Sequence, residues 1–466
     1  MRYPPEAVCC VLTGKHSSWP ITASEKEGLA LIDVFPKVLH RDFFTLGYLI
    51  HFARAAVLGL ALVSANSSYA TIATDLFVES QQLVYQIRVI DIASGDKYSI
   101  GSGFLVGATG NAVTNFHVVS SYVHEPDKYR LEFVRSDDSV APLNLLAIDV
   151  VHDLALVHTG EPEAEVLPLA TESLAQGDRI YSLGNPHDLG MTIIEGTYNG
   201  LVENSRYKKI LFSGSLNAGM SGGPTLNDSG EVVGVNVSKG GEQISFLVPV
   251  EHVHTLLAQN DSFTGTRDFE AEITATLLAD QQQFYQGLLD QEVTVKPMGH
   301  LQVAGKLAES IKCWGHTVDE DDIKYEAVHQ HCNLEDQIYL SESLYVGDFR
   351  YDYEVVQTKE LNRFQLYNYL EGRFEHRAFY NTTDKDEVTE YRCHGDVMEL
   401  ESGRWNISTC FRAYKRFEGL YDTSMIMVSV DYNDRAAIVK VAASGVSSSN
   451  ATAIFRHLIE AVEWIP

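Results

Sequence analysis

The stretch LNAGMSGGPTLNDSGEVVGVNVS, residues Leu216–Ser238, places Ser221 in a glycine-rich turn between two runs of β-forming residues. The conformation of a turn does not by itself require the sequence Ser-Gly-Gly-Pro, so we infer that this turn holds the Ser221 side chain in place for a function. Glycine at 219, 222 and 223 allows backbone geometry that a side chain would obstruct. Because the amides of Gly219 and Ser221 can then face one point, the stretch predicts a nucleophile beside an oxyanion site.

Two stretches upstream supply the partners that a serine nucleophile needs. GSGFLVGATGNAVTNFHVVSSYV, Gly101–Val123, contains His117, and IDVVHDLALVHT, Ile148–Thr159, places Asp153 directly before an apolar strand. A serine hydroxyl is a poor nucleophile until a base accepts its proton, and the pKa of histidine suits that task. A buried carboxylate then orients the imidazole. Asp149 is the alternative candidate for the carboxylate that orients the imidazole.

The three motifs, in the order His, Asp, Ser, resemble those of trypsin-like peptidases of the chymotrypsin fold. The resemblance is closest to the bacterial HtrA/DegP-type branch, through TNFHVV, DLALV and GMSGGP. Tyr181–Pro186 (YSLGNP) and Gln243–Pro249 (QISFLVP) are similar to two further segments of that branch. Met220 departs from the usual Asn or Asp, and the sequence after Pro249 shows no PDZ glycine-loop signature. The resemblance covers roughly residues 80–260, and a motif match remains a hypothesis until its geometry is known.

The resemblance implies a role for each matching residue. His117 is expected to be the general base, Asp153 rather than Asp149 its orienting partner, and Ser221 the nucleophile. The amides of Gly219 and Ser221 are expected to form the oxyanion hole.

The resemblance also implies a specificity pocket with Ser215 at its base. Its wall is expected to be Val237-Ser238-Lys239. A small neutral base disfavours strict cleavage after Arg or Lys, because no carboxylate would pair the substrate cation. Small or apolar side chains are therefore expected before the scissile bond. Lys239 leaves open an acidic preference, or it points to solvent.

The strand pattern predicts a mainly β fold. Short Val/Ile/Leu-rich runs separated by Gly, Asn, Asp and Pro indicate an all-β barrel or sandwich, and the resemblance makes it a two-barrel protease domain. The predicted organisation is a signal segment at 1–70, a protease domain at 71–262, a helical connector at 263–292 and a Cys/Tyr-rich α+β domain at 293–466. The role of that last domain is not predicted.

The N-terminal region carries a predicted export signal. Ala55–Val63 is an unbroken apolar run preceded by arginines and followed by small residues. These are the parts of a cleavable signal peptide, with cleavage expected after Ala65 or Ala70 and a periplasmic location. An uncleaved anchor, with the protease outside the cytoplasm, is the alternative. The formal net charge of −28 argues against nucleic acid and against anionic membrane surfaces as partners.

The cysteines fit an exported chain. Cys313, Cys332, Cys393 and Cys410 follow the signal segment. Their spacing favours the pairs Cys313–Cys332 and Cys393–Cys410 over the other two connectivities. Free thiols or a zinc site with nearby histidines are weaker alternatives.

The resulting hypothesis is an exported serine endopeptidase that hydrolyses protein or peptide substrates through an acyl-enzyme, without metal or cofactor. Membrane association is expected only if the N-terminal segment stays uncleaved. One alternative is a catalytically silent protease fold that serves as a peptide-binding chaperone or scaffold. Another is a self-limited protease that cuts only its own chain or one partner. The sequence does not indicate the oligomeric state.

Overall fold

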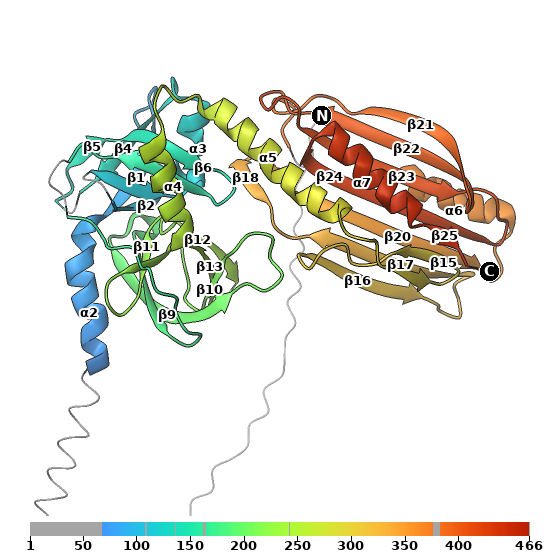
Figure 1. The fold of residues 1–466 in the computed structure, drawn as a ribbon, viewed down its shortest axis with the longest axis horizontal. Helices are drawn as coiled ribbons and strands as arrows, with labels where there is room; N and C mark the ends of the chain where they lie inside the picture. Colours follow the sequence, from blue (N-terminus) through green and yellow to red (C-terminus); the bar gives the residue numbers. More distant parts are fainter. Residues whose placement is uncertain are drawn as a thin grey trace, which may run out of the picture. The chain divides into compact units, whose positions relative to one another are not determined.

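The computed structural model describes residues 68–107, 110–135, 137–161, 165–241, 243–375 and 383–465 (Figure 1). The fold is mainly β, as predicted. Ala55–Val63 and Ala65 lie outside the described residues, while Ala70 lies in helix α2 (Ser68–Ser80). Among the helices in the described ranges, none combines the length and apolar character that a membrane crossing requires.

The first sheet contains seven strands in the order β5-β4-β1-β2-β3-β7-β6. Its buried faces are rich in Val, Ile, Leu and Phe, which suits strands with covered faces. Helix α3 (Phe116–His124) follows β3 and was not predicted. The strand bounds are β1 Val84–Asp91, β2 Lys97–Leu105, β3 Asn111–Thr114, β4 Tyr129–Val134, β5 Val140–Pro142, β6 Asn144–Asp149 and β7 Leu154–His158.

The second sheet closes into a barrel in the order β10-β13-β12-β11-β8-β9. Helix α4 (Val250–Ser262) follows its last strand. Closure leaves no free edge in this half of the domain. The strand bounds are β8 Arg179–Gly184, β9 Thr192–Leu201, β10 Ile210–Phe212, β11 Pro224–Leu226, β12 Val232–Gly241 and β13 Ile244–Pro249.

The C-terminal region is built on a seven-stranded antiparallel sheet in the order β16-β17-β20-β24-β23-β22-β21. Helix α7 (Ser448–Glu460) covers one face of this sheet and α6 (Arg363–Glu375) the other (Figure 1). The remaining strands form two small sheets, β14-β15-β25 and β18-β19. The bounds are β14 Val295–Met298, β15 Leu301–Ala304, β16 Ile311–Val318, β17 Tyr325–Leu334, β18 Ile338–Ser341, β19 Leu344–Val346, β20 Phe349–Thr358, β21 Arg392–Leu400, β22 Gly403–Ala413, β23 Tyr421–Ser429, β24 Arg435–Val446 and β25 Glu463–Trp464.

Both favoured disulfides are present in this region. Cys313–Cys332 joins β16 to β17, and Cys393–Cys410 joins β21 to β22. In each hairpin the two cysteines are direct cross-strand partners. The two bridges therefore fasten the opposite edge strands of the sheet to their neighbours.

Helix α5 (Phe269–Leu289) matches the predicted connector helix, and the Asp268 side chain caps it by accepting from the Ala271 amide. Its buried side chains enter two cores. Tyr285 and Leu288 join the core under the C-terminal sheet. Ile273 and Leu277 join a cluster that also contains Phe116 of α3 and Val150 of the turn after β6, which we call the shared cluster. Its buried members are Phe116, Val150, Ile273, Leu277, Ile338, Leu340, Leu344, Val346, Val388, Tyr414, Phe417 and Leu420.

A buried carboxylate joins the C-terminal region to the second barrel. Asp336, just before β18, accepts from the Arg206 amide at 2.6 Å and from Lys209 Nζ at 2.6 Å. The Ser205 hydroxyl lies 3.0 Å from both carboxylate oxygens. The Asp336 side chain is only 9% exposed. Hydrogen bonds to a buried charged group are among the strong ones, so this contact fixes the start of the β18–β19 hairpin.

Asp336→Ala should lower the free energy of unfolding by about 2 kcal/mol, because the change leaves Lys209 and the Arg206 amide without their acceptor. Denaturant titration of the full chain measures this. Glu251→Gln is the matched control, since the side chains of the Lys208–Glu251 pair are 62% and 54% exposed and such surface pairs contribute little. Equal losses in the two variants would contradict the assigned role of Asp336.

Candidate active site

His117 and Asp153 form a hydrogen-bonded pair at the start of α3. The His117 Nδ1 atom lies 2.6 Å from Asp153 Oδ2, and the His117 amide donates to Asp153 Oδ1 at 2.8 Å. Asp153 occupies a left-handed turn between β6 and β7, with φ +55°. Asn115 Nδ2 donates to the Asp153 carbonyl at 2.8 Å and holds that turn. The carboxylate therefore fixes both the tautomer and the direction of the imidazole.

The electrostatics of this pair favour the imidazolium form. Burial acts to lower the pKa of His117, whereas the charge of Asp153 and its hydrogen bond raise it. The net result is a His117 pKa above its ordinary value of 6.5. Such a balance suits a group that must accept a proton and then carry it beside a carboxylate.

Asp149, the rival carboxylate, has a different partner. Its Oδ2 atom lies 2.7 Å from His152 Nδ1, and its Oδ1 atom accepts from the His152 amide at 3.1 Å. Burial raises the pKa of Asp149, but the hydrogen bonds and charge of His152 hold the pKa below its usual value. The His152 ring stacks on His252 at a centroid distance of 3.7 Å. Asp149 thus belongs to a second His–Asp pair, adjacent to the first.

Ser221 lies on the turn between β10 and β11, and its hydroxyl donates to the Val237 carbonyl at 3.0 Å. Within the described part of the chain, no hydrogen bond joins Ser221 to His117. Rotation about the Ser221 side chain is therefore required before His117 can accept its proton. The predicted juxtaposition of all three side chains is met directly only for His117 and Asp153.

The turn that carries Ser221 depends on glycine at two positions. Gly219 and Gly222 have φ +95° and +84°. A Cβ atom on Gly219 would lie 2.4 Å from the Asn185 carbonyl oxygen, and one on Gly222 would lie 2.3 Å from the Ser102 carbonyl oxygen. Side chains are excluded at both positions by conformation and by space.

The amides of Gly219 and Ser221 remain available to a ligand. Among the hydrogen bonds of the described residues, neither amide donates to a protein acceptor. Two free donors on one tight turn can hold a developing oxyanion at no reorganisation cost.

Ser102 on β2 fixes this turn to the first sheet. Its amide donates to the Ser221 carbonyl at 2.8 Å, and its hydroxyl donates to the Gly219 carbonyl at 2.7 Å. The same hydroxyl accepts from the Asn185 amide at 3.0 Å. Ser102 is fully buried. The GSG motif was noted in the sequence, but the role of its serine was not predicted.

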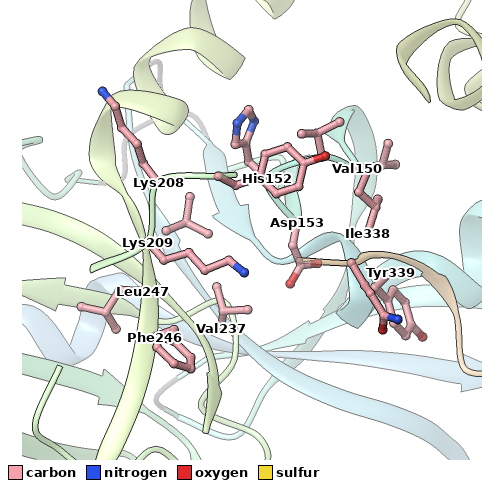
Figure 2. A pocket seen from close by; sticks show the side chains of 14 residues that line it. Val150, His152, Asp153, Lys208, Lys209, Val237, Phe246, Leu247, Ile338 and Tyr339 are labelled. Atoms are coloured by element: carbon pink, nitrogen blue, oxygen red, sulfur yellow. The ribbon is translucent and has the colours of Figure 1, made fainter. Parts of the chain in front are cut away.

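The predicted specificity residues are only partly placed by the structure. Ser215 is half-buried, and the neighbouring Leu216 amide donates to Ser245 Oγ at 3.1 Å. Val237 lines a cavity of about 180 Å³ together with Asp153 and Tyr339 (Figure 2). Ser215 is not part of its lining. The side chains of Ser238 and Lys239 lie outside the described residues.

Tyr339, which sequence reasoning missed, lies beside the catalytic candidates. Its ring meets the His117 imidazole edge-on, with centroids 5.9 Å apart and an interplanar angle of 74°. The alternating pattern of residues 338–346 signals a hairpin, but nothing in it indicates contact with His117.

Ser102→Ala should destabilise the protein by about 1–3 kcal/mol, because it leaves the buried Gly219 carbonyl and the Asn185 amide unpaired. Denaturant titration is the measurement. Ser94→Ala, at an exposed turn of the same sheet, should change stability by less than about 0.5 kcal/mol. A loss no larger than that of Ser94→Ala would show that Ser102 does not hold the turn.

Comparison with known proteins gives consistent results over this part of the chain. Residues 101–235 match the trypsin-like peptidase domain family. Serine protease HTRA1 of Xenopus tropicalis is 32% identical over 176 residues, which are 36% of this chain and 37% of that protein. Mitochondrial serine protease HTRA2 of Bos taurus is 31% identical over 222 residues, 44% of this chain and 47% of that protein.

Among solved structures, the serine endoprotease from Yersinia pestis aligns with 40% of this chain and 66% of its own, at 23% identity and a TM-score of 0.35. The chain spans less than half the length of the two HtrA relatives. Over residues 101–235 the chain contains a trypsin-like peptidase domain, and it is related there to the HtrA serine proteases.

Proposed function

We propose that the chain is a serine endopeptidase that cleaves protein or peptide substrates with Ser221, His117 and Asp153. The observation that carries the proposal is the His117–Asp153 pair, in which one carboxylate accepts from both the imidazole and the amide of the histidine. Such a pair orients a base toward a nucleophile. The homology to serine proteases supports the same assignment.

The proposed reaction has two halves. Neutral His117 accepts the Ser221 proton while Ser221 Oγ bonds to the scissile carbonyl carbon, and the amides of Gly219 and Ser221 hold the oxyanion. His117 then gives its proton to the leaving amine as the C–N bond breaks, which forms the acyl-enzyme. Water then attacks the ester carbonyl while His117 accepts its proton, and His117 returns that proton to Ser221 Oγ as the ester C–O bond breaks, which releases the acid and free Ser221.

Substrate preference and location extend this proposal. With the neutral Ser215 at the proposed pocket base, small or apolar side chains are proposed before the scissile bond. Export to an oxidising compartment such as the periplasm is proposed from the apolar run at Ala55–Val63, and two disulfides support it.

A second candidate function is a silent scaffold that binds peptides without cutting them. The specific observation in its favour is the Ser221 hydroxyl, which donates to the Val237 carbonyl rather than to His117. If that arrangement persisted when a peptide binds, the serine would stay protonated and unreactive.

Labelling by a fluorophosphonate separates the two candidates. The full chain should be labelled at Ser221 and should hydrolyse unfolded casein, and Ser221→Ala should lose both properties. Thr225→Ser, a hydroxyl-retaining change elsewhere on the turn's β11, serves as the control and should keep both. A wild-type chain that resists the label would favour the scaffold, and equal casein hydrolysis by Ser221→Ala would refute the role of Ser221.

The labelling rate should rise with pH, with a midpoint above 6.5. Only neutral His117 can accept a proton, and the raised pKa of His117 keeps the protonated form populated to higher pH. A midpoint below 6.5 would argue against His117 as the base.

Asp153→Asn should slow labelling by about 10⁴-fold and shift the midpoint down, because the charge that raises the pKa of His117 is gone. Asp149→Asn is the matched control. It should stay close to wild type, since Asp149 contacts His152 and not His117. The reverse ranking of the two variants would transfer the orienting role to Asp149.

A further inference from the structure

The β18–β19 hairpin of the C-terminal region rests on the helix that carries His117. Tyr339 contacts the first turn of α3 and the residue one turn further along: its ring meets Phe116 edge-on at 6.5 Å and His117 at 5.9 Å, and its hydroxyl lies 3.4 Å from Ser120 Oγ. One turn further along, His124 Nε2 lies 2.8 Å from the Leu340 carbonyl oxygen. The hairpin thus follows the whole helix rather than touching it at one point.

The Tyr339 ring is held in place from behind. Tyr345, across the hairpin, meets it edge-on at a centroid distance of 5.3 Å. The flanking Ile338 and Leu340 are buried in the shared cluster, and Asp336 fastens the entry to the hairpin. Because Ile338 and Leu340 anchor the strand on both sides of Tyr339, the ring has a fixed position beside α3.

The Tyr339 side chain lines two cavities near His117. One, of about 180 Å³, is lined by Asp153, Val237 and Tyr339 (Figure 2). The other, of about 390 Å³, is lined by Ser120, His124 and again Tyr339. Burial raises the pKa of Tyr339 to about 12, so the ring stays neutral at any working pH. In the proposed reaction the scissile carbonyl bonds to Ser221 Oγ beside the His117 imidazole, and the Tyr339 ring occupies space next to that imidazole.

We propose that Tyr339 is a positioning and specificity-determining residue, supplied to the protease domain by the C-terminal region. Its ring keeps the imidazole of His117 against Asp153 and restricts the substrate side chain that lies next to that imidazole to small residues. This inference rests on the proposed endopeptidase function and names a further determinant of its substrate class.

The test uses the full chain, a fluorophosphonate, and quenched-fluorescence peptides in which Ala or Phe is placed at each position around the cleaved bond. Tyr339→Ala should still label at Ser221, but more slowly than Tyr339→Phe, because no ring then keeps the His117 imidazole against Asp153. It should raise the kcat/KM ratio of the Phe to the Ala peptide at one position by about tenfold, because a ring-sized space opens there. Tyr339→Phe keeps the ring and should keep the wild-type ratio. Tyr339→Leu serves the same purpose as Tyr339→Ala if the smaller side chain prevents folding.

Tyr345→Ala is the matched control, because it removes an equal ring from the same hairpin without a contact to His117. It should change the peptide ratios much less than Tyr339→Ala does, because the Tyr339 ring is still present between the buried Ile338 and Leu340. The proposal is overturned if Tyr339→Ala shows the wild-type ratios, or if Tyr345→Ala changes them equally, since the effect would then come from the hairpin as a whole. Failure of the wild type to label at Ser221 would instead overturn the proposed function, and this proposal with it.

Discussion

The active-site candidate depends on the way one buried serine joins two sheets. Ser102 holds the Ser221 turn through the carbonyls of Ser221 and Gly219, and its own carbonyl accepts from Thr114 Oγ1 at 2.7 Å. Thr114 ends β3 and lies two residues before the first residue of α3. One residue therefore sets the distance between the turn that carries Ser221 and the helix that carries His117. Gly222 is part of the same constraint, because a side chain there would push the two sheets apart.

Much of this site could be predicted from sequence because its chemistry demands particular residue types. The motifs TNFHVV and DLALV, which resemble those of HtrA-type peptidases, indicated His117 and Asp153. The glycines around Ser221 indicated a tight turn. The disulfide pairs followed from short spacing, and the connector helix from periodic apolar residues. The triad assignment stays a prediction, since Ser221 contacts Val237 and not His117.

Other features were beyond such reasoning for physical reasons. The contacts of Asp336 with Arg206 and of Tyr339 with Ser120 join residues 130 and 219 positions apart. Both contacts are determined by tertiary packing, and no local sequence pattern predicts them. An aspartate before a hairpin and a tyrosine within one are common in protein sequences. Their roles here depend on the residues that they contact in the folded chain. The division of the apolar side chains of α5 between two cores could not be predicted for the same reason. Periodicity indicates that one face of a helix is buried, but it does not indicate which residues cover that face.

The shared cluster makes the N-terminal sheets and the C-terminal region dependent on each other for a complete hydrophobic core. Phe116 is fully buried and immediately precedes His117, yet its neighbours in that cluster come from α5 and from residues beyond 330. A protein truncated to the matched segment would expose this ring and Val150 to water, and an uncovered apolar patch beside the active site promotes aggregation. The matched segment is thus not a self-contained folding unit, because the helix that carries His117 is covered by side chains from a region encoded later in the same polypeptide.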